Sequence, residues 1–146
     1  MKNLLLISLL LLISSCATKL STVDVTNQNQ KNLGNVIVSS PLILCSTEKL
    51  NHFAPKNVKF ALQKAYSNHC FYENKLVLKI KKGDALFLQK VVKHSALALF
   101  HFESLYVLGE YKHKNLTYKF YYDLSKFQRS DATLQELFQS KDIPWN

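Results

Sequence analysis

Apolar and polar residues alternate along much of the second half of the chain, with the period of two that a half-buried β-strand requires. In the segment 75–81, one face carries the apolar residues Leu76, Leu78 and Ile80. The opposite face carries lysines, so this strand is predicted to have a basic outer surface. A turn at 82–84 and a second apolar run at 85–92 then predict a β-hairpin fringed with lysine.

A second hairpin is predicted nearer the carboxyl end. The segment 116–124 alternates most regularly, and a turn at 112–115 joins it to the apolar segment 105–111. Residues 93–95 interrupt the pattern, and 96–102 with 105–111 fits either two strands or one long bent strand. We expect this hairpin to lie at the centre of an antiparallel sheet.

The first half of the chain shows two other patterns. Short aliphatic runs at 36–38 and 42–45 flank Ser39-Ser40-Pro41, which predicts one strand broken by a turn or bulge. Apolar residues then recur at helical spacing, at Val58, Ala61, Leu62, Ala65 and Tyr66. This spacing predicts an amphipathic helix over 56–67.

The carboxyl end predicts a small helical module. Thr133 and Glu136 fit a capping box, and the helix is expected over 134–139 with Leu134, Leu137 and Phe138 facing inward. Trp145 is predicted to close the core. Together these elements predict one α+β domain over 36–146. Its sheet would be a small antiparallel sheet or partly open β-barrel of five to six strands, with one helix on its N-terminal side and a short C-terminal helix.

The amino end has the order of a secretory signal: Lys2, an apolar run at 4–13, two serines and Cys16. The run is about half the roughly 20 residues that a membrane-spanning helix needs. Ile13-Ser14-Ser15-Cys16 resembles the lipobox of bacterial lipoproteins. The alternative is an ordinary signal peptide cut near Ser15 or Ala17.

The resemblance implies cleavage after Ser15, diacylation of the Cys16 thiol and, in Gram-negative bacteria, acylation of the new amino terminus. Two or three acyl chains anchor a protein stably. Ala17 is not the aspartate that retains enterobacterial lipoproteins at the inner membrane, which favours the outer membrane. Residues 16–35 are rich in Thr, Asn, Gln and Ser, and they are expected to form a flexible tether.

The net charge of +9 comes almost entirely from lysine, because Arg129 is the only arginine. Nucleic-acid readers rely on the bidentate arginine fork, so nucleic-acid binding is disfavoured. A lysine-rich surface still attracts anionic lipids and glycans. The anion-binding candidates are Lys75, Lys79, Lys81, Lys82 and Lys90. The alternative is that these lysines only protect an edge strand from aggregation.

Cys45 and Cys70 form an even pair in a protein predicted to be exported, so a disulfide between them is expected. Closing a loop of about 25 residues should stabilise the domain by roughly 3 kcal/mol. The alternative is a metal site that includes His52 and His69, but no Cys-x-x-Cys or His-x-x-x-His pair supports it. No metal or cofactor is predicted.

Enzyme motifs such as Gly-x-Ser-x-Gly, His-Glu-x-x-His or a phosphate-binding glycine loop are absent from the sequence. The histidines are dispersed, and the carboxylates Glu103, Glu110, Asp123 and Asp131 show no pairing on one face. We therefore expect no enzyme. The first hypothesis is a lipid-anchored accessory subunit of an envelope protein assembly, docked through its sheet face or edge. The second is a binder of envelope polyanions, such as lipopolysaccharide, through the lysine-rich hairpin.

Overall fold

The computed structural model describes residues 19–26, 33–47, 55, 57–65, 69–71, 75–97, 101–125 and 133–146. The signal segment 1–15 and Cys16, on which the lipobox prediction rests, lie outside these residues.

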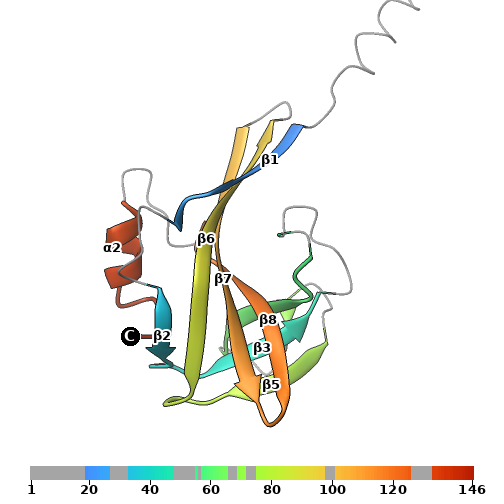
Figure 1. Ribbon diagram of the computed structural model, residues 1–146, viewed down its shortest axis with the longest axis vertical. Helices are drawn as coiled ribbons and strands as arrows, with labels where there is room; N and C mark the ends of the chain where they lie inside the picture. The colour runs from blue at the N-terminus through green and yellow to red at the C-terminus, as the bar shows by residue number, and fades with distance from the viewer. Residues whose placement is uncertain are drawn as a thin grey trace, which may run out of the picture.

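Strands dominate the described part of the chain (Figure 1). They are β1 (Lys19–Asp24), β2 (Gly34–Ile37), β3 (Leu42–Ser46), β4 (Phe60–Lys64), β5 (Leu76–Ile80), β6 (Ala85–Leu97), β7 (His101–His113) and β8 (Leu116–Asp123). One short helix, α2 (Leu134–Gln139), follows among the described residues. All eight strands belong to one sheet, so the prediction of an α+β fold with five to six strands and an N-terminal-side helix is wrong.

The predicted helix over 56–67 is replaced by strand β4. Ala61 and Leu62 are consecutive in sequence and both are buried, on opposite faces of the sheet. A strand buried on both faces places apolar residues side by side, and this arrangement also satisfies helical spacing over a short run. The pairing partners decide the outcome: β4 lies between β3, antiparallel, and β8, parallel.

The predicted hairpin of β5 and β6 is also wrong, although both strands and the turn between them are present. β5 pairs with β3 and β6 pairs with β2, with the same register on both sides of the bend, from Gly34↔Leu88 to Leu42↔Ile80. The segments 34–46 and 76–88 therefore form two long bent strands that turn a corner together.

The corner is held by backbone bonds between the two bent strands. The Val38 amide donates to the Asp84 carbonyl and the Gly83 amide donates to the Val38 carbonyl, each at 2.9 Å. Gly83 has a φ of 95°, which glycine adopts without strain. The Asp84 carboxylate also accepts a bond from the Lys81 amide at 2.9 Å. The chain consequently changes direction without folding back on itself.

The second hairpin is confirmed, because β7 and β8 pair in antiparallel register from Tyr106↔Asp123 to His113↔Leu116. Residues 93–95 do not interrupt the sheet but lie inside the long strand β6. Residues 19–24, which were expected in the flexible tether, form β1 and pair with β6. In Figure 1, β1 lies beside the upper part of the β6–β7 ribbon.

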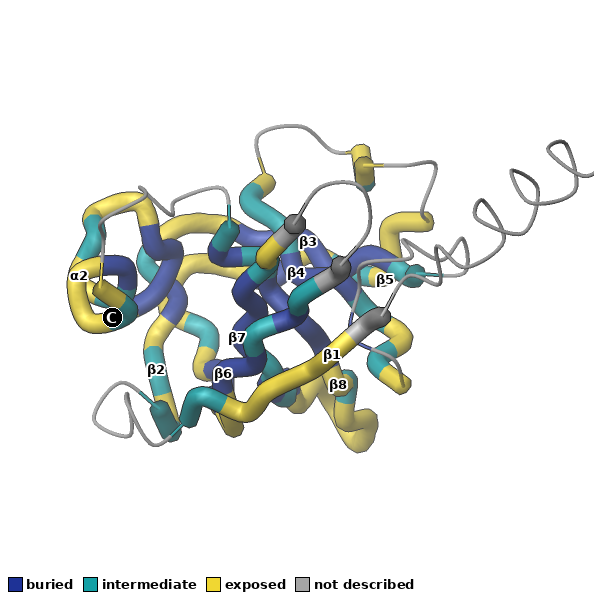
Figure 2. The backbone as a smooth tube through the Cα atoms, turned by 90° about the horizontal axis from the view of Figure 1, so that it is seen from above, coloured by how far each residue is buried: buried dark blue, intermediate teal, exposed yellow. Residues whose placement is uncertain are grey.

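The strand pairings form a closed ring. From β6 they lead through β7, β8 and β4 to β3, and β2, which precedes β3 on the same bent strand, pairs with β6 again. The enclosed space holds the main core, which includes Leu42, Val107, Phe120 and Leu124. Figure 2 shows the buried residues concentrated inside this closed sheet, whereas β1 is largely exposed.

The carboxyl tail covers one side of the core, as predicted. The capping box of Thr133 and Glu136 is present at the start of α2. Trp145 is 6% exposed and contacts Tyr122 edge-to-face, with ring centroids 4.9 Å apart. Asn146 exchanges two backbone hydrogen bonds with Ile37, so the tail is paired to β2.

The disulfide between Cys45 and Cys70 is confirmed, with Cα atoms 5.9 Å apart. It links β3 to the connection between β4 and β5. Strand β4 takes the place of the helix expected before Cys70. The bond therefore does not attach a helix to β3.

Candidate interaction surface

Strand β5 is an open edge of the sheet. Among the described residues, its strand neighbour is β3 alone. β5 is continuous with β6, and β6 has β2 on one edge and β7 on the other. Because β3 continues β2, the open edge of β5 must be the one on the side of β7. Unpaired backbone groups on such an edge can pair with another chain.

The two faces of β5 have different chemistry. Leu78 and Ile80 face the core, and Ile80 is 1% exposed. A register shift between Leu44 and Cys45 makes Val77 a bulge residue, so Leu76 pairs with Cys45 and lies on the outward face. Leu76 and Val77, each 39% exposed, lie together at this bulge beside exposed lysines. An apolar stripe on a protein surface next to unpaired backbone is a typical feature of an interaction site.

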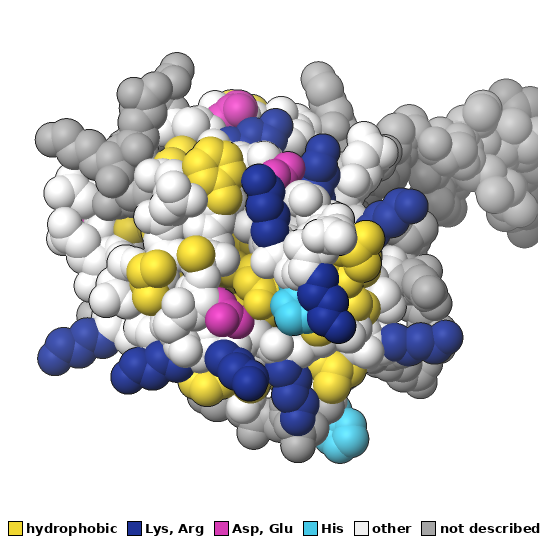
Figure 3. All heavy atoms as spheres, turned by 60° about the horizontal axis from the view of Figure 1, so that its bottom comes forward, with side chains coloured by type: hydrophobic (Ala, Val, Ile, Leu, Met, Phe, Trp, Pro, Cys, Tyr) yellow, Lys and Arg dark blue, Asp and Glu magenta, His cyan; other side chains and the backbone are white. Residues whose placement is uncertain are grey.

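The structure brings together four of the five predicted lysines. Lys79 lies on the outward face of β5, Lys75 directly precedes the strand, and Lys81 and Lys82 follow it in the corner. Within the described part of the chain, none of the four forms an ion pair. Figure 3, turned to bring this end of the molecule forward, shows lysine side chains interspersed with apolar ones.

Lys90 does not belong to this group. It lies on β6 at the bulge between Leu88 and Lys90, opposite Leu108 of β7. Its ammonium group is close enough to Asp24 to help lower the pKa of that carboxyl, although hydrogen bonds from Thr26 contribute more. Lys90 therefore interacts with the end of β1 and lies apart from the four lysines at β5 and the corner.

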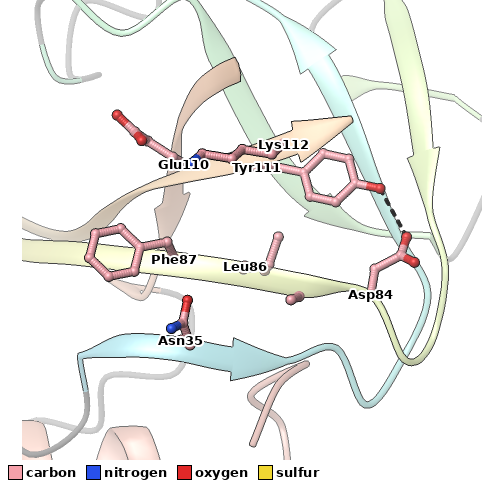
Figure 4. A pocket seen from close by; sticks show the side chains of 8 residues that line it. Asn35, Asp84, Leu86, Phe87, Glu110, Tyr111 and Lys112 are labelled. Atoms are coloured by element: carbon pink, nitrogen blue, oxygen red, sulfur yellow. Dashed lines mark hydrogen bonds between the residues drawn. The ribbon is translucent and has the colours of Figure 1, made fainter. Parts of the chain in front are cut away.

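A half-open hollow of about 480 Å³ lies where β6 and β7 separate. Their pairing ends at Phe87↔Glu110, beyond which β6 bends toward β5 and β7 continues toward β8. Figure 4 shows the side chains that line the hollow, which come from β2, from β6 with its preceding corner, and from β7. They include Asn35, Asp84, Leu86, Phe87, Glu110, Tyr111 and Lys112.

One hydrogen bond bridges the separated strands at the end of the hollow nearest the corner. The Tyr111 hydroxyl donates to the Asp84 carboxylate at 3.0 Å. Burial raises the pKa of Tyr111 to about 12, and the hydrogen bond and charge of Asp84 add to this effect. The phenol therefore stays protonated and fixes the position of the corner relative to β7.

The sequence did not identify the hollow. Asp84 was recognised only as a turn residue and Tyr111 only as an apolar strand residue. Phe87 gave a usable signal, because an aromatic residue lies on the outward face between the buried Leu86 and Leu88. The separation of β6 from β7 depends on long-range pairing and had no local signal.

The other polar candidates have structural partners. His94 is buried in β6, where its ring contacts Tyr106 and the Thr22 hydroxyl lies 3.0 Å from its Nδ1 atom. Glu103 forms an ion pair with Lys93 at 2.7 Å, and the Asp123 carboxylate accepts a bond from the Ser125 amide. His52 and Asp131 lie outside the described residues.

The metal alternative requires Cys45 and Cys70 as free thiols, but the two are joined to each other. No group of three or more potential metal ligands occurs within the described residues. The described part of the chain also has no helix with the length and apolar character needed to cross a membrane. Comparison with protein-family models, curated proteins and solved structures finds no match.

Proposed function

We propose that this protein is a lipid-anchored subunit of the bacterial cell envelope that binds a partner protein along the open edge of β5. It acts without catalysis, as an accessory component of an envelope assembly. The lipobox ending at Cys16 supports the anchor, and Ala17 favours the outer membrane. One observation carries the docking role: the unpaired edge of β5, with Leu76 and Val77 exposed beside lysines.

The strand-addition mode of recognition explains why this edge can bind. An extended segment laid beside β5 gains backbone hydrogen bonds, and its side chains select the partner. The rest of the sheet provides a rigid support, because β3, the neighbour of β5, is buried at four consecutive positions, 42–45. The edge therefore offers a preorganised template, which reduces the entropy cost of binding.

The grouping of Lys75, Lys79, Lys81 and Lys82 favours one second candidate, the binding of an anionic glycan or lipid such as lipopolysaccharide. Such binding would rest on charge, so it should weaken steeply between low and physiological salt. The lipidated protein can be tested against vesicles with and without lipopolysaccharide. Binding that is insensitive to salt would argue against this candidate.

The docking role can be tested by charge reversal in the host. In one variant Lys75, Lys79 and Lys81 are replaced by Glu; in the control, Lys59, Lys90 and Lys141 are replaced by Glu. Both sets are exposed and change the net charge equally. After chemical crosslinking and purification, we expect one or a few envelope proteins to be recovered in fixed proportion with the parent and the control.

The β5 variant should lose those proteins. If the two triple variants recover the same proteins in the same amounts, the open edge is not the docking surface. If both variants lose them equally, the overall charge of the protein governs the interaction, and this result also contradicts docking at β5.

A further inference from the structure

We infer that the hollow between β6 and β7 is a binding site for an uncharged sugar residue. This site goes beyond the proposed docking role, because none of the residues that line the hollow belongs to β5. The observation behind it is an exposed aromatic side chain with hydrogen-bonding side chains on both flanks.

Phe87 is the middle member of a row of three side chains on the outward face of the sheet. It pairs with Asn35 of β2 on one side and with Glu110 of β7 on the other. Side chains that face each other across antiparallel strands have Cβ atoms roughly 5 Å apart. Lys112 lies two residues beyond Glu110, on the same face of β7. Figure 4 shows Phe87 on β6, between Asn35 on β2 and Glu110 on β7.

The side chains of this row are available to a ligand. Phe87 is 44% exposed, although phenylalanine is among the residue types most often buried. Among the described residues, no hydrogen bond or ion pair engages the side chains of Asn35, Glu110 or Lys112. The hollow therefore offers an amide, a carboxylate and an ammonium group around an uncovered aromatic ring.

A sugar ring has the two kinds of surface that this group of side chains can contact. Its C–H bonds form an apolar patch, which packs on an aromatic ring because both surfaces leave water and the face of the ring is electron-rich. Its hydroxyl groups both donate and accept hydrogen bonds. The Glu110 carboxylate can accept from a hydroxyl, and the Asn35 amide can both donate and accept.

The size of the hollow also suits such a ligand. Its volume of about 480 Å³ lies within the range of roughly 300–1,000 Å³ that is typical of small-molecule sites. Ala85 lies two residues before Phe87 on the same face and is exposed, so the apolar lining extends beyond the aromatic ring. Leu86 and Tyr111, both buried, line the inner part.

Other ligand classes fit the hollow less well. The lining holds two carboxylates, of Asp84 and Glu110, but one ammonium group, of Lys112. A phosphate or sulfate group would therefore meet like charge here, in contrast to the lysines near β5. An acyl chain would displace water from Asn35 and Glu110 without replacing its hydrogen bonds, at a cost of about 1–3 kcal/mol for each group.

The test uses the lipidated protein in micelles of a detergent that has no sugar headgroup, so that the detergent does not compete. The probes are tri-N-acetylchitotriose and cellotriose, two uncharged trisaccharides. Backbone amide shifts measured by NMR during a titration locate the site and give the affinity. We expect saturable binding of at least one probe, with the largest shifts around residues 35, 87 and 110. Absence of saturable binding by both probes, or shifts centred elsewhere, would overturn the inference.

Substitutions of exposed aromatic residues provide the matched control. Phe87→Leu keeps an apolar side chain but removes the aromatic face, so we expect the affinity to fall about tenfold. Phe87→Tyr keeps the aromatic face and should bind like the parent. Phe71→Leu should also bind like the parent, since Phe71 is 49% exposed but does not line the hollow. Equal affinities of Phe87→Leu and the parent would contradict stacking on Phe87.

One further variant separates the sugar site from the docking edge. Lys79→Glu changes the outward face of β5 and should leave the affinity for the trisaccharides unchanged. A loss as large as that of Phe87→Leu would overturn a site confined to the hollow. If the trisaccharides bind at Phe87 and β5 captures no envelope protein in the host, the docking role fails and the sugar site stands.

Discussion

Strands β2–β3 and β5–β6 form one bent ribbon, and its two ends differ in whether their edges are covered. At the β2 end, the carboxyl tail pairs with Ile37 and packs Trp145 against Tyr122, so backbone and apolar surface are covered together. At the β5 end, backbone and apolar surface are left open together, beside a row of lysines. The same ribbon thus carries one edge built for stability and one available for binding.

The largest effect should come from opening the closed edge. Trp145→Ala removes a buried aromatic side chain, and the expected loss is about 3–5 kcal/mol in the free energy of unfolding. Urea denaturation measures it. Leu116→Ala is the control, since Leu116 is 61% exposed and its truncation should change stability by less than about 0.5 kcal/mol. Equal losses would show that the tail does not close the core.

Removing the disulfide should have the next largest effect. Replacing Cys45 and Cys70 together by Ala removes a crosslink that spans 25 residues, and the expected loss is about 3 kcal/mol. The parent protein in the presence of a reductant should unfold at a urea concentration close to that of the double variant. If a reductant leaves the urea midpoint of the parent unchanged, the disulfide contributes nothing to stability.

Gly109→Ala tests how tightly β6, β7 and β8 pack beside the hollow. An added Cβ atom would lie 2.6 Å from the Phe87 carbonyl oxygen and 2.8 Å from the Phe120 ring. The carbonyl belongs to the backbone and cannot easily move away, so we expect a loss of about 1–3 kcal/mol. Gly83→Ala, where no atom lies near the added Cβ, separates this crowding from the strain of a positive φ.

Tyr111→Phe should cost about 1 kcal/mol at neutral pH, because it removes the hydrogen bond to Asp84. The pH dependence is more specific. The pKa of Tyr111 is about 12 in the folded protein and 10.0 ordinarily, so the unfolded chain loses this proton first. Stability should fall as the pH rises from 10 to 12, and this part of the decline should be missing in Tyr111→Phe. An identical decline in both proteins would contradict the assignment.

The smallest effect on stability is expected at the open edge. Lys79→Glu changes an exposed residue with no ion pair among the described residues, so the free energy of unfolding should change by less than about 0.5 kcal/mol. The same substitution should weaken partner recovery from the host. A large loss of stability would show that Lys79 stabilises the sheet and is not simply part of a binding surface.

Local pattern predicted some parts of this fold and failed at others for identifiable reasons. The alternation in the sequence of 116–124 predicted β8, although its burial does not alternate, since Phe120, Tyr121 and Tyr122 are buried in succession. The sequence Thr133-x-x-Glu136 predicted the helix start. Gly109 is a glycine inside a strand, where the Phe87 carbonyl oxygen approaches too closely for a side chain. Ala61 and Leu62 were misassigned because burial on both faces removes alternation. The pairing of β5 with β3 and of β4 with β8 joins distant segments and has no local signature.

The most direct test of the open edge is photocrosslinking in the host from single positions. A photoreactive residue is placed at Val77 on β5, and, as controls, at Val23 on β1 and Leu116 on β8, all of which are exposed. The account predicts that Val77 crosslinks one or a few envelope proteins in fixed proportion and that the two controls do not. The absence of an adduct at Val77, or the same adducts from all three positions, would contradict docking at the β5 edge.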